Sequence, residues 1–387
     1  MKITDVEPIC LLMPIERSIA APISIPFPEK LTSVIFSDYR TTLVRVHTDE
    51  GISGVGECMV RLAPTATRDI VDAIKPVLIG ADPFDTDVLW EQLWGVMMNR
   101  GHNKGFFVEA MSGIYIALWD LLGKALHKPV YKLLGGSYRN RLWVYASSLR
   151  FRGLETTLEE AHRLRASGFD AMKIKIGQDR HRWREDIRLV EAVRNAVGPD
   201  VTLMVDVNCG YDRNTALMVG RELERLQIYW FEEPLPPDDV EGYVALADAL
   251  DIPVAAGESE FTRYGFKSLI TRGAVDIVQP NVSRTGGFSE CRKIAAMAST
   301  YHIPYAPHTG SSSLVCMAAS LHLSCALKDF LIYEYMTSDW ARDQRNPLRH
   351  DLATLPAGDV ADGHVFVSDR PGLGIELNED VVRRYRV

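Results

Sequence analysis

Beyond Gly136 the chain repeats a strand-then-helix unit, and this repeat limits the possible folds more than any other feature of the sequence. Eight short runs rich in aliphatic and β-branched residues occur at 142–147, 171–176, 202–207, 228–232, 254–256, 276–279, 303–306 and 330–333. Amphipathic segments lie between them, for example at 158–167, 186–197, 215–226, 241–250 and 290–301. Such units with short connections predict an α/β fold, a closed parallel (β/α) barrel of the TIM type.

An open, doubly wound sheet is the alternative arrangement of the same repeat. Such a sheet usually carries a glycine-rich phosphate loop after its first strand. Here the first run continues into Ser147, Ser148, Leu149 and Arg150 instead. The closed barrel is therefore the preferred prediction.

The segment before the repeat predicts a smaller α+β unit. Residues 41–48 alternate apolar and polar side chains, and a turn at 49–51 leads to a further strand at 52–58. Residues 67–126 change to helical spacing, whereas the proline-containing segment 14–28 is expected to be an irregular loop.

These patterns divide the chain into three parts. We predict an α+β capping domain at 1–135, the barrel with the catalytic site at 136–345, and a tail at 346–387. The tail loses the strand–helix period and is expected to return to the cap.

Charge and cysteine content narrow the class of partner. A net charge of −8 offers no basic surface to nucleic acid or an acidic membrane, so a small-molecule partner is expected. The six cysteines form no C-x-x-C pair, and the N-terminus lacks the basic-then-apolar run of a signal peptide. No uninterrupted apolar run reaches the roughly 18 residues that span a bilayer. We therefore predict a cytoplasmic protein with reduced thiols.

Three acidic residues stand where barrel strands are expected to end. Asp206, Glu232 and Glu258 follow the third, fourth and fifth runs and are separated by 26 residues in both intervals. Carboxylates that converge from adjacent strands suit Mg²⁺, a hard cation that prefers oxygen ligands. A single acid in this position is more often a helix N-cap, but the equal spacing favours a metal site. Glu233 is expected to face away, because successive strand residues point to opposite faces.

Two lysines occupy the second predicted strand. Lys173 and Lys175 are two residues apart, so both point to one face, while Met172, Ile174 and Ile176 take the other face and pack against helices. The lysines should therefore face the barrel interior, where mutual repulsion is expected to lower the pKa of at least one of them. The alternative is a pair of exposed lysines on an edge strand.

Two further polar residues complete the predicted mouth. His308 follows the seventh run and Glu334 follows the eighth, so both should lie at the same end of the barrel. A histidine beside carboxylates and a lysine is a candidate acid or base.

In combination these residues resemble the mandelate racemase group of the enolase superfamily. The shared motifs are the K-x-K pair, the three acids, the FEEP sequence at 231–234, the histidine in APHTG, the late Glu334, the segment 117–136 and the terminal PGLGIE. The resemblance implies a Mg²⁺-dependent enzyme that removes the proton alpha to a carboxylate.

The resemblance also implies roles for individual residues. Lys175 would be one base, and Lys173 would hold down its pKa and contact the substrate carboxylate. Glu334 would donate or share a proton with that carboxylate, and His308 would approach the opposite face of the substrate. Asn208 would contact the substrate or support the ligands around it.

One residue departs from the family pattern. Relatives orient the histidine with an aspartate in a Q-P-D sequence, but this chain has Asn281 after Gln279 and Pro280. Asp276 lies at the other end of that strand and cannot replace it. We expect the Asn281 carbonyl to accept the Nδ1 proton of His308, which leaves His308 a weaker base than in relatives.

Several reactions are compatible with this residue set. Dehydration of an aldonate or aldarate to a 2-keto-3-deoxy acid comes first, and racemisation or epimerisation of a 2-hydroxy acid second. Cycloisomerisation ranks third, because the muconate-lactonising group has a lysine where Asn281 stands. A barrel that binds an acid sugar without turning it over is the remaining alternative.

The substrate itself has no transferable motif in the sequence. The segment 18–32 and the neighbourhood of Arg61 are expected to recognise it, and the candidate side chains are those of Arg40, Arg61, His102 and Lys104. By resemblance, the chain is also expected to form a homo-oligomer.

Overall fold

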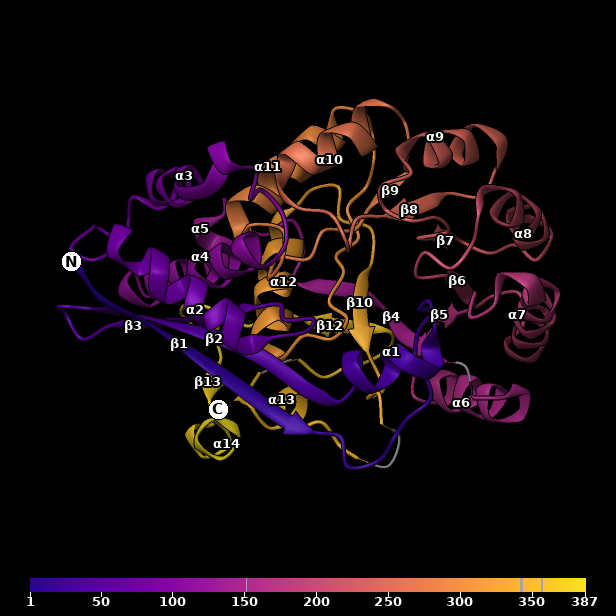
Figure 1. The fold of residues 1–387 in the computed structure, drawn as a ribbon, viewed down its shortest axis with the longest axis horizontal. Helices are drawn as coiled ribbons and strands as arrows, with labels where there is room; N and C mark the ends of the chain where they lie inside the picture. Colours follow the sequence, from indigo (N-terminus) through magenta and orange to yellow (C-terminus); the bar gives the residue numbers. More distant parts are fainter. Residues whose placement is uncertain (151, 342–343, 356–357) are drawn as a thin grey trace.

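The predicted barrel is present, and its strands follow the order of the chain (Figure 1). The computed structural model describes residues 1–150, 152–341, 344–355 and 358–387. The strands are β4 (Arg141–Leu149), β5 (Ala171–Lys175), β6 (Thr202–Asp206), β7 (Phe231–Glu232), β8 (Val254–Ala256), β9 (Ile277–Val278) and β10 (Tyr333–Met336). They pair in parallel in the order β10-β4-β5-β6-β7-β8-β9.

The run at 303–306, predicted as the seventh strand, is reduced to a single bridging residue. Tyr305 pairs in parallel with Val278 on one side and Phe330 on the other, and thereby joins β9 to the start of the eighth run. Proline occupies 304 and 307, and proline has no N–H to donate to a ladder. The flanking prolines therefore explain why this strand is so short.

One apolar side chain from each of the eight runs fills the barrel. These residues form a buried cluster separate from the rest of the core: Tyr145, Ala171, Met204, Trp230, Ala255, Ile277, Ala306 and Ile332. Met172, Ile174 and Ile176 lie in the larger cluster between sheet and helices, as the alternation along β5 predicts. The interior is thus packed, and polar side chains collect at its mouth.

Seven helices alternate with the strands and cover the outside of the barrel. They are α6 (Leu154–Ala166), α7 (Trp183–Val197), α8 (Arg213–Arg225), α9 (Val240–Ala249), α10 (Thr262–Thr271), α11 (Gly287–Ser299) and α12 (Leu314–Ala326). Polar N-caps begin three of them, since the side chains of Asp212, Asp239 and Ser313 accept from Thr215 N, Gly242 N and Val315 N.

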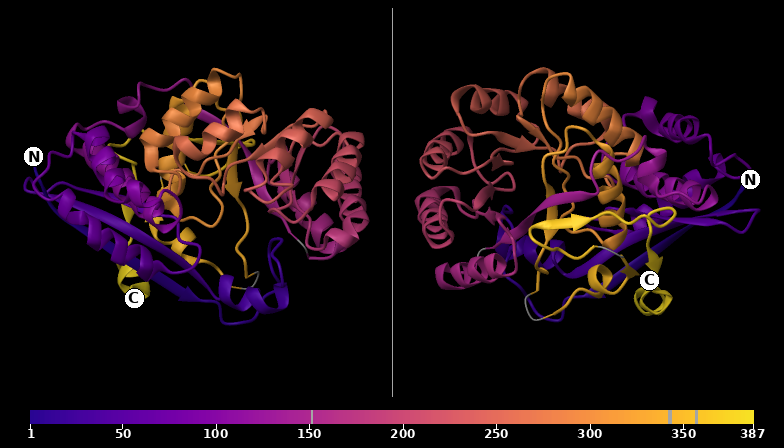
Figure 2. Two further views of the ribbon diagram at one scale, coloured as in Figure 1. Left: turned by 45° about the horizontal axis from the view of Figure 1, so that its top comes forward. Right: turned by 180° about the vertical axis from the view of Figure 1, so that it is seen from behind.

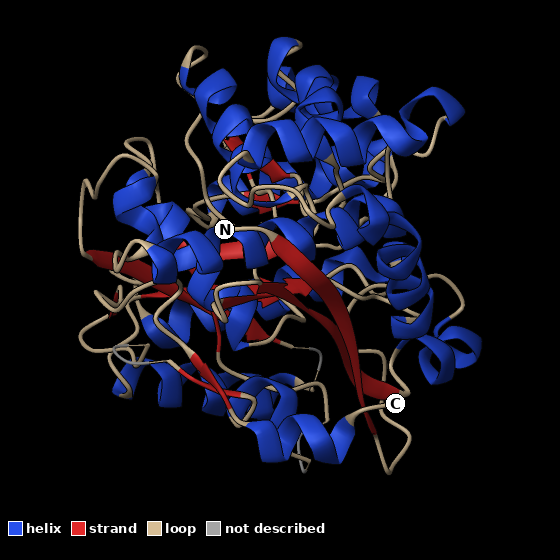
Figure 3. Ribbon diagram, turned by 90° about the vertical axis from the view of Figure 1, so that its left-hand side faces the viewer, coloured by secondary structure: helices blue, strands red, loops and turns tan. Residues whose placement is uncertain are grey.

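The cap is an antiparallel sheet of β1 (Ile3–Pro14), β2 (Asp38–Thr48) and β3 (Ser53–Cys58), covered by helices. Figure 3 shows the long cap strands beside the helices. The helices are α1 (Pro28–Ile35), α2 (Pro64–Ile74), α3 (Thr86–Met97), α4 (Phe106–Ala125) and α5 (Val130–Leu133). The helix α1, which begins at a proline, was not among the predicted elements.

Helix α4 is the core of the cap. Its backbone approaches β3 closely at Gly54 and Gly56, where a Cβ would collide with the carbonyls of Ala117 and Gly113. The helix is long and apolar enough to span a membrane, but 94% of its apolar window is buried inside the protein. Its composition therefore reflects its place between β3 and the other helices.

The C-terminal segment returns to the cap, as predicted. It contains α13 (Pro347–His350), β11 (Ala353–Thr354), β12 (His364–Phe366), β13 (Glu376–Leu377) and α14 (Glu379–Tyr385). Strand β12 pairs with β4 of the barrel, and Val387 N donates to Cys10 O of β1 at 3.1 Å. The right-hand view of Figure 2 shows this segment crossing behind the barrel toward the cap.

Candidate active site

The three predicted carboxylates converge at the mouth of the barrel. Asp206 ends β6, Glu232 ends β7, and Glu258 follows β8 by two residues, so neighbouring parallel strands deliver all three to one place. One carboxylate oxygen from each lies within 4.8 Å of the others, and all three residues are buried. Three carboxylate oxygens this close together form an all-oxygen donor set, which fits Mg²⁺.

One carboxylate oxygen of Glu232, Oε2, accepts hydrogen bonds from two neutral donors. Its Oε2 accepts from Trp230 Nε1 at 2.9 Å and from Gln279 Nε2 at 2.8 Å. Its Oε1 accepts from Lys173 Nζ at 2.6 Å. Burial raises the pKa of Glu232 above its usual range, although Lys173 opposes that shift.

Glu258 is held differently, by a guanidinium and an imidazole. Its Oε1 accepts from Arg61 Nη2 at 2.9 Å, and its Oε2 lies 3.2 Å from His308 Nε2. Burial would raise the pKa of Glu258, but His308 and Arg61 outweigh it and lower that pKa to about 2.

Both lysines of β5 face the interior, which excludes the exposed-edge alternative. Lys173 is fully buried, and its Nζ lies 2.6 Å from Glu232, 3.1 Å from Glu334 and 3.4 Å from Asp206. Burial alone would lower the pKa of Lys173, but these carboxylates raise it well above its usual value. Lys173 is therefore not the lysine whose pKa mutual repulsion lowers, because its nearest charges are carboxylates.

Lys175 is the last residue of β5 and lies nearer the mouth. Its Nζ forms an ion pair with Asp206 and donates to Asn208 Oδ1 at 2.7 Å. The backbone N–H of Asn208 also donates to Asp206 Oδ1 at 2.9 Å. Asn208 has φ 47°, in the left-handed region, and this turn places its amide beside Lys175. Asn208 thus supports both Lys175 and Asp206.

His308 and Asn281 are in contact as predicted, but the NH₂ end of the Asn281 amide, rather than its oxygen, faces the imidazole. Asn281 Nδ2 lies 3.1 Å from His308 Nδ1, while Asn281 Oδ1 accepts from Ser283 N at 2.9 Å. A backbone N–H can only donate, so it fixes Oδ1 on its side and directs the NH₂ group at the imidazole. The expectation that the Asn281 carbonyl accepts the Nδ1 proton is therefore wrong.

This orientation determines the tautomer of His308. Because Nδ1 accepts a hydrogen bond, the proton of the neutral ring is on Nε2, which points to Glu258 at 3.2 Å. Burial lowers the pKa of His308, although Glu258 and Glu334 oppose that shift. His308 therefore presents a donor to the mouth rather than a free lone pair.

Glu334 lies within β10 at the far side of the mouth. It accepts from Thr309 N at 2.6 Å, Gly310 N at 3.0 Å and Ser147 Oγ at 2.8 Å. Burial would raise the pKa of Glu334, but Lys173, His308 and these donors lower it far below its usual range. Glu334 thus accepts from three donors in this structure, and its role of donating or sharing a proton with the substrate carboxylate stays a prediction.

The cap covers this mouth. Ser24 Oγ donates to Gly177 O at 2.8 Å, and Gln178 Nε2 donates to Ala21 O at 3.2 Å, so the segment 15–27 lies over the loop after β5. Of the four cap side chains singled out from sequence, Arg61 reaches the carboxylates, whereas Lys104 pairs with Glu260 at 2.7 Å. The other two lie apart from them: Arg40 pairs with Asp38 inside the cap, and His102 is exposed.

Two groups of contacts were missed by the sequence analysis. Gln279 directly follows β9, and its place at the end of a predicted strand could have put it beside Glu232. Glu57 of β3 accepts from Thr41 Oγ1, Ser313 N, Ser313 Oγ and Cys316 N, and thereby joins the cap to the start of α12. No local pattern signals the second contact.

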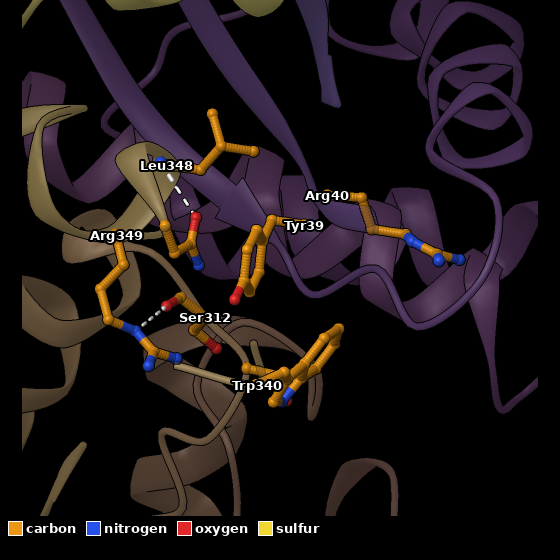
Figure 4. Close-up of a pocket in the computed structure, with 8 residues that line it drawn as sticks. Tyr39, Arg40, Ser312, Trp340, Leu348 and Arg349 are labelled. Atoms are coloured by element: carbon orange, nitrogen blue, oxygen red, sulfur yellow. Dashed lines mark hydrogen bonds between the residues drawn. The ribbon is translucent and has the colours of Figure 1, made fainter. Parts of the chain in front are cut away.

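A small cavity beside the cap strand β2 is distinct from this mouth (Figure 4). Its volume is about 20 Å³, and its walls include Tyr39, Ser312, Trp340 and Arg349. Such a space holds about one water molecule. It is therefore too small for an acid sugar, and the mouth with the three carboxylates remains the candidate site.

Family comparisons match nearly the whole chain. Residues 16–135 match the "Mandelate racemase / muconate lactonizing enzyme, N-terminal domain", and residues 156–381 match "Enolase C-terminal domain-like".

Curated relatives are similar over most of their length. The chain is 35% identical over 365 residues to D-galactarolactone cycloisomerase from Agrobacterium fabrum, which covers 93% of this chain and 95% of that protein. It is 34% identical over 345 residues to arabinonate dehydratase from Saccharolobus solfataricus, with 88% and 89% covered.

Solved structures share the fold over the entire chain. The 3,6-anhydro-D-galactonate cycloisomerase from Zobellia galactanivorans superposes with a TM-score of 0.87 at 30% identity, with 100% of both chains covered. A racemase from Streptomyces coelicolor A3(2) with bound magnesium superposes with a TM-score of 0.85 at 26% identity, again with 100% of both chains covered.

Proposed function

We propose, from the premise that this chain belongs to the mandelate racemase and muconate lactonizing enzyme family of the enolase superfamily, that it dehydrates an acid sugar in a Mg²⁺-dependent reaction. The observation that carries the proposal is the mouth itself. Three carboxylates lie within 4.8 Å of one another, Lys175 forms an ion pair with the first, and His308 Nε2 lies 3.2 Å from the third. Arabinonate, D-xylonate and D-galactonate dehydratases among the relatives support the same reaction class.

Asp206, Glu232 and Glu258 would hold Mg²⁺, which when bound supplies positive charge to the substrate carboxylate and stabilises the charge left by the departing alpha proton. Lys173, kept charged by its carboxylate neighbours, would face the substrate carboxylate. Lys175, at the mouth end of β5, would accept the alpha proton on Nζ in its neutral form, which the ion pair with Asp206 disfavours and a cation held by Asp206 would favour.

His308 would act on the leaving group. Its Nε2–H would donate a hydrogen bond to the departing hydroxyl at C3, while Asn281 holds the ring through Nδ1. The neutral ring keeps this proton, and the hydroxyl leaves as water with a proton taken from solvent. The alpha proton accepted by Lys175 returns to solvent, which balances the step. The enol that remains tautomerises to a 2-keto-3-deoxy acid.

A racemase would need His308 as a second base of comparable strength. The Nδ1-acceptor orientation leaves Nε2 protonated, which disfavours that alternative. Cycloisomerisation is the stronger second candidate, because two cycloisomerases are among the similar proteins. If the oxygen leaving C3 belongs to a ring, the same residues would open the ring without releasing water.

The test is a panel of aldonates, aldarates and their lactones incubated with protein and Mg²⁺, with 2-keto acids measured by semicarbazide and product masses by mass spectrometry. Dehydration gives a product lighter by one water, whereas cycloisomerisation leaves the mass unchanged. Lys175→Ala is the control that should remove either activity. If no acid of the panel reacts, the chain is a binding protein and the proposal fails.

We also propose the division into a cap at 1–135, a barrel at 136–345 and a tail at 346–387, self-association into a homo-oligomer, and a place in the cytoplasm. The segments matched by the two family models, 16–135 and 156–381, support the division. Light scattering during size-exclusion chromatography tests the self-association, and a single protomer mass would contradict it.

A further inference from the structure

Arg61 is the single cap side chain, among the residues the structure describes, that forms an ion pair with one of the three carboxylates. It follows the end of β3, and its Nη2 donates to Glu258 Oε1 at 2.9 Å. The segment is anchored next to it, because Met59 N donates to Ser283 O at 2.9 Å. The guanidinium is partly open to solvent, with 30% of the side chain exposed, whereas Glu258 is buried.

A second guanidinium, that of Arg284, opposes the position of Arg61 beside Glu258. Arg284 lies close by, and burial and then Arg61 lower the pKa of Arg284, which records the repulsion between the two guanidiniums. Arg284 has its own partner, since its Nε lies 3.4 Å from Glu109 Oε1. Arg61 forms an ion pair with no carboxylate besides Glu258 in the described parts of the chain, so Glu258 is the nearest charge that offsets this repulsion.

Resting on the proposed function, we infer that Arg61 and the metal ion compete for Glu258. Once the ion binds Glu258, Arg61 binds an anionic or hydroxyl group of the acid sugar. The oxygens of Glu258 are the donors that a cation at the carboxylate trio would use, and Arg61 already occupies one of them. An ion there reduces the attraction of Glu258 for the guanidinium, while Arg284 continues to repel it.

Metal binding in the barrel would thereby change a contact that the cap makes. Arg61 comes from the cap and Glu258 from the barrel, so exchange of this pair for a contact with the substrate couples metal binding to recognition of the acid. Metal and acid would then bind in that order. Arg61 would act as a residue that sets substrate affinity, with no part in the proton transfers.

The chain offers a matched control in Lys104. Its Nζ lies 2.7 Å from Glu260, so it also joins cap to barrel by an ion pair, two residues beyond Glu258. Glu260 is not part of the carboxylate trio. Removal of this pair changes the contact between cap and barrel without removing a charge from the metal site.

The experiment is calorimetric titration of chelator-treated protein with MgCl₂ alone. Arg61→Gln should bind Mg²⁺ at least about threefold more tightly than wild type, because a competing cation is gone, and Arg61→Lys should restore part of the difference. Lys104→Gln should bind as wild type does. Equal or weaker binding by Arg61→Gln would overturn the inference, whereas wild-type protein that binds no Mg²⁺ would overturn the proposed metal site instead.

The second readout uses the panel acid with the highest kcat/KM at saturating Mg²⁺. Arg61→Gln should raise KM about fivefold or more and change kcat less, as expected when a binding contact is lost. An unchanged KM would refute the substrate contact. If no acid of the panel reacts, the proposed function fails, and the Mg²⁺ titration still decides the competition.

Discussion

Replacement of Asn281 by aspartate tests the tautomer of His308 and, through it, the choice of reaction. In the wild-type protein Asn281 donates to Nδ1 at 3.1 Å, and Oδ1 is held by Ser283 N. Asn281→Asp keeps the second contact but places a carboxylate oxygen opposite Nδ1. A carboxylate cannot donate, so Nδ1 must acquire the proton and Nε2 becomes a lone pair or part of an imidazolium.

The size of the effect follows from this distance. An opposite charge in hydrogen-bond contact with a buried imidazole raises its pKa by about 1 to 3 units, equivalent to roughly 1 to 4 kcal/mol. Where His308 acts as a base, as in proton exchange from its face, the acidic limb of the pH–rate profile should therefore move to higher pH. Solvent deuterium should also enter C2 from the His308 face, while dehydration should improve by less than about tenfold.

The direct assay is ¹⁵N NMR of histidine-labelled protein, with the His308 signals identified from a His308→Asn variant. Wild type should show protonated Nε2 and unprotonated Nδ1, and Asn281→Asp should show protonated Nδ1. Asn281→Ala, which removes the donor without adding charge, is the control. Protonated Nδ1 in the wild-type protein would show that Asn281 does not donate to His308. A gain of several orders of magnitude in dehydration by Asn281→Asp would show that the wild-type protein is not adapted to dehydration.

Four further outcomes are expected. Lys175→Ala should abolish exchange of the alpha proton, whereas Lys173→Ala should retain some exchange with weaker binding; a dead Lys173→Ala beside an active Lys175→Ala would reverse the assignment. Mn²⁺ soaked into crystals should give an anomalous peak among Asp206, Glu232 and Glu258, and a peak elsewhere would contradict the metal site. Glu57→Gln should lower the free energy of unfolding in urea by roughly 2 kcal/mol, because one carboxylate oxygen becomes an NH₂ group and the two donors bound to that oxygen lose a buried acceptor; an unchanged value would show that the contact adds nothing. Burial lowers the pKa of His322 from 6.5 to about 4, so the unfolded chain binds the proton more readily than the folded protein does. The free energy of unfolding should therefore fall by roughly 3 kcal/mol as the pH drops from about 6.5 to about 4, and His322→Gln should remove that dependence.

Features set by local periodicity could be predicted from the sequence. The alternation along β5 placed Lys173 and Lys175 on the interior face, and the equal spacing of Asp206, Glu232 and Glu258 placed them on successive strand ends. Both follow from the geometry of strands and of the (β/α) repeat, which act over short stretches of chain.

Features set by contacts between distant segments could not be predicted in this way. The two ends of an asparagine amide have nearly the same shape, so the orientation of Asn281 depends on the donors that the fold brings near, here Ser283 N and Cys316 Sγ. The pKa of Lys173 likewise depends on Glu334, which is 161 residues away. Arg61 reaches Glu258 across 197 residues, and no pattern around either residue indicates the pairing.

The most direct test of the account is proton NMR of the panel acids in D₂O with wild-type protein, in the presence and absence of Mg²⁺. With Mg²⁺ present and Lys175 intact, at least one acid sugar should lose its C2 proton signal, either by exchange for deuterium or by elimination. Asp206→Asn should abolish that loss. Undiminished loss of the C2 proton after complete chelation, or in Lys175→Ala, would contradict the claim that this mouth removes the alpha proton with the help of a metal.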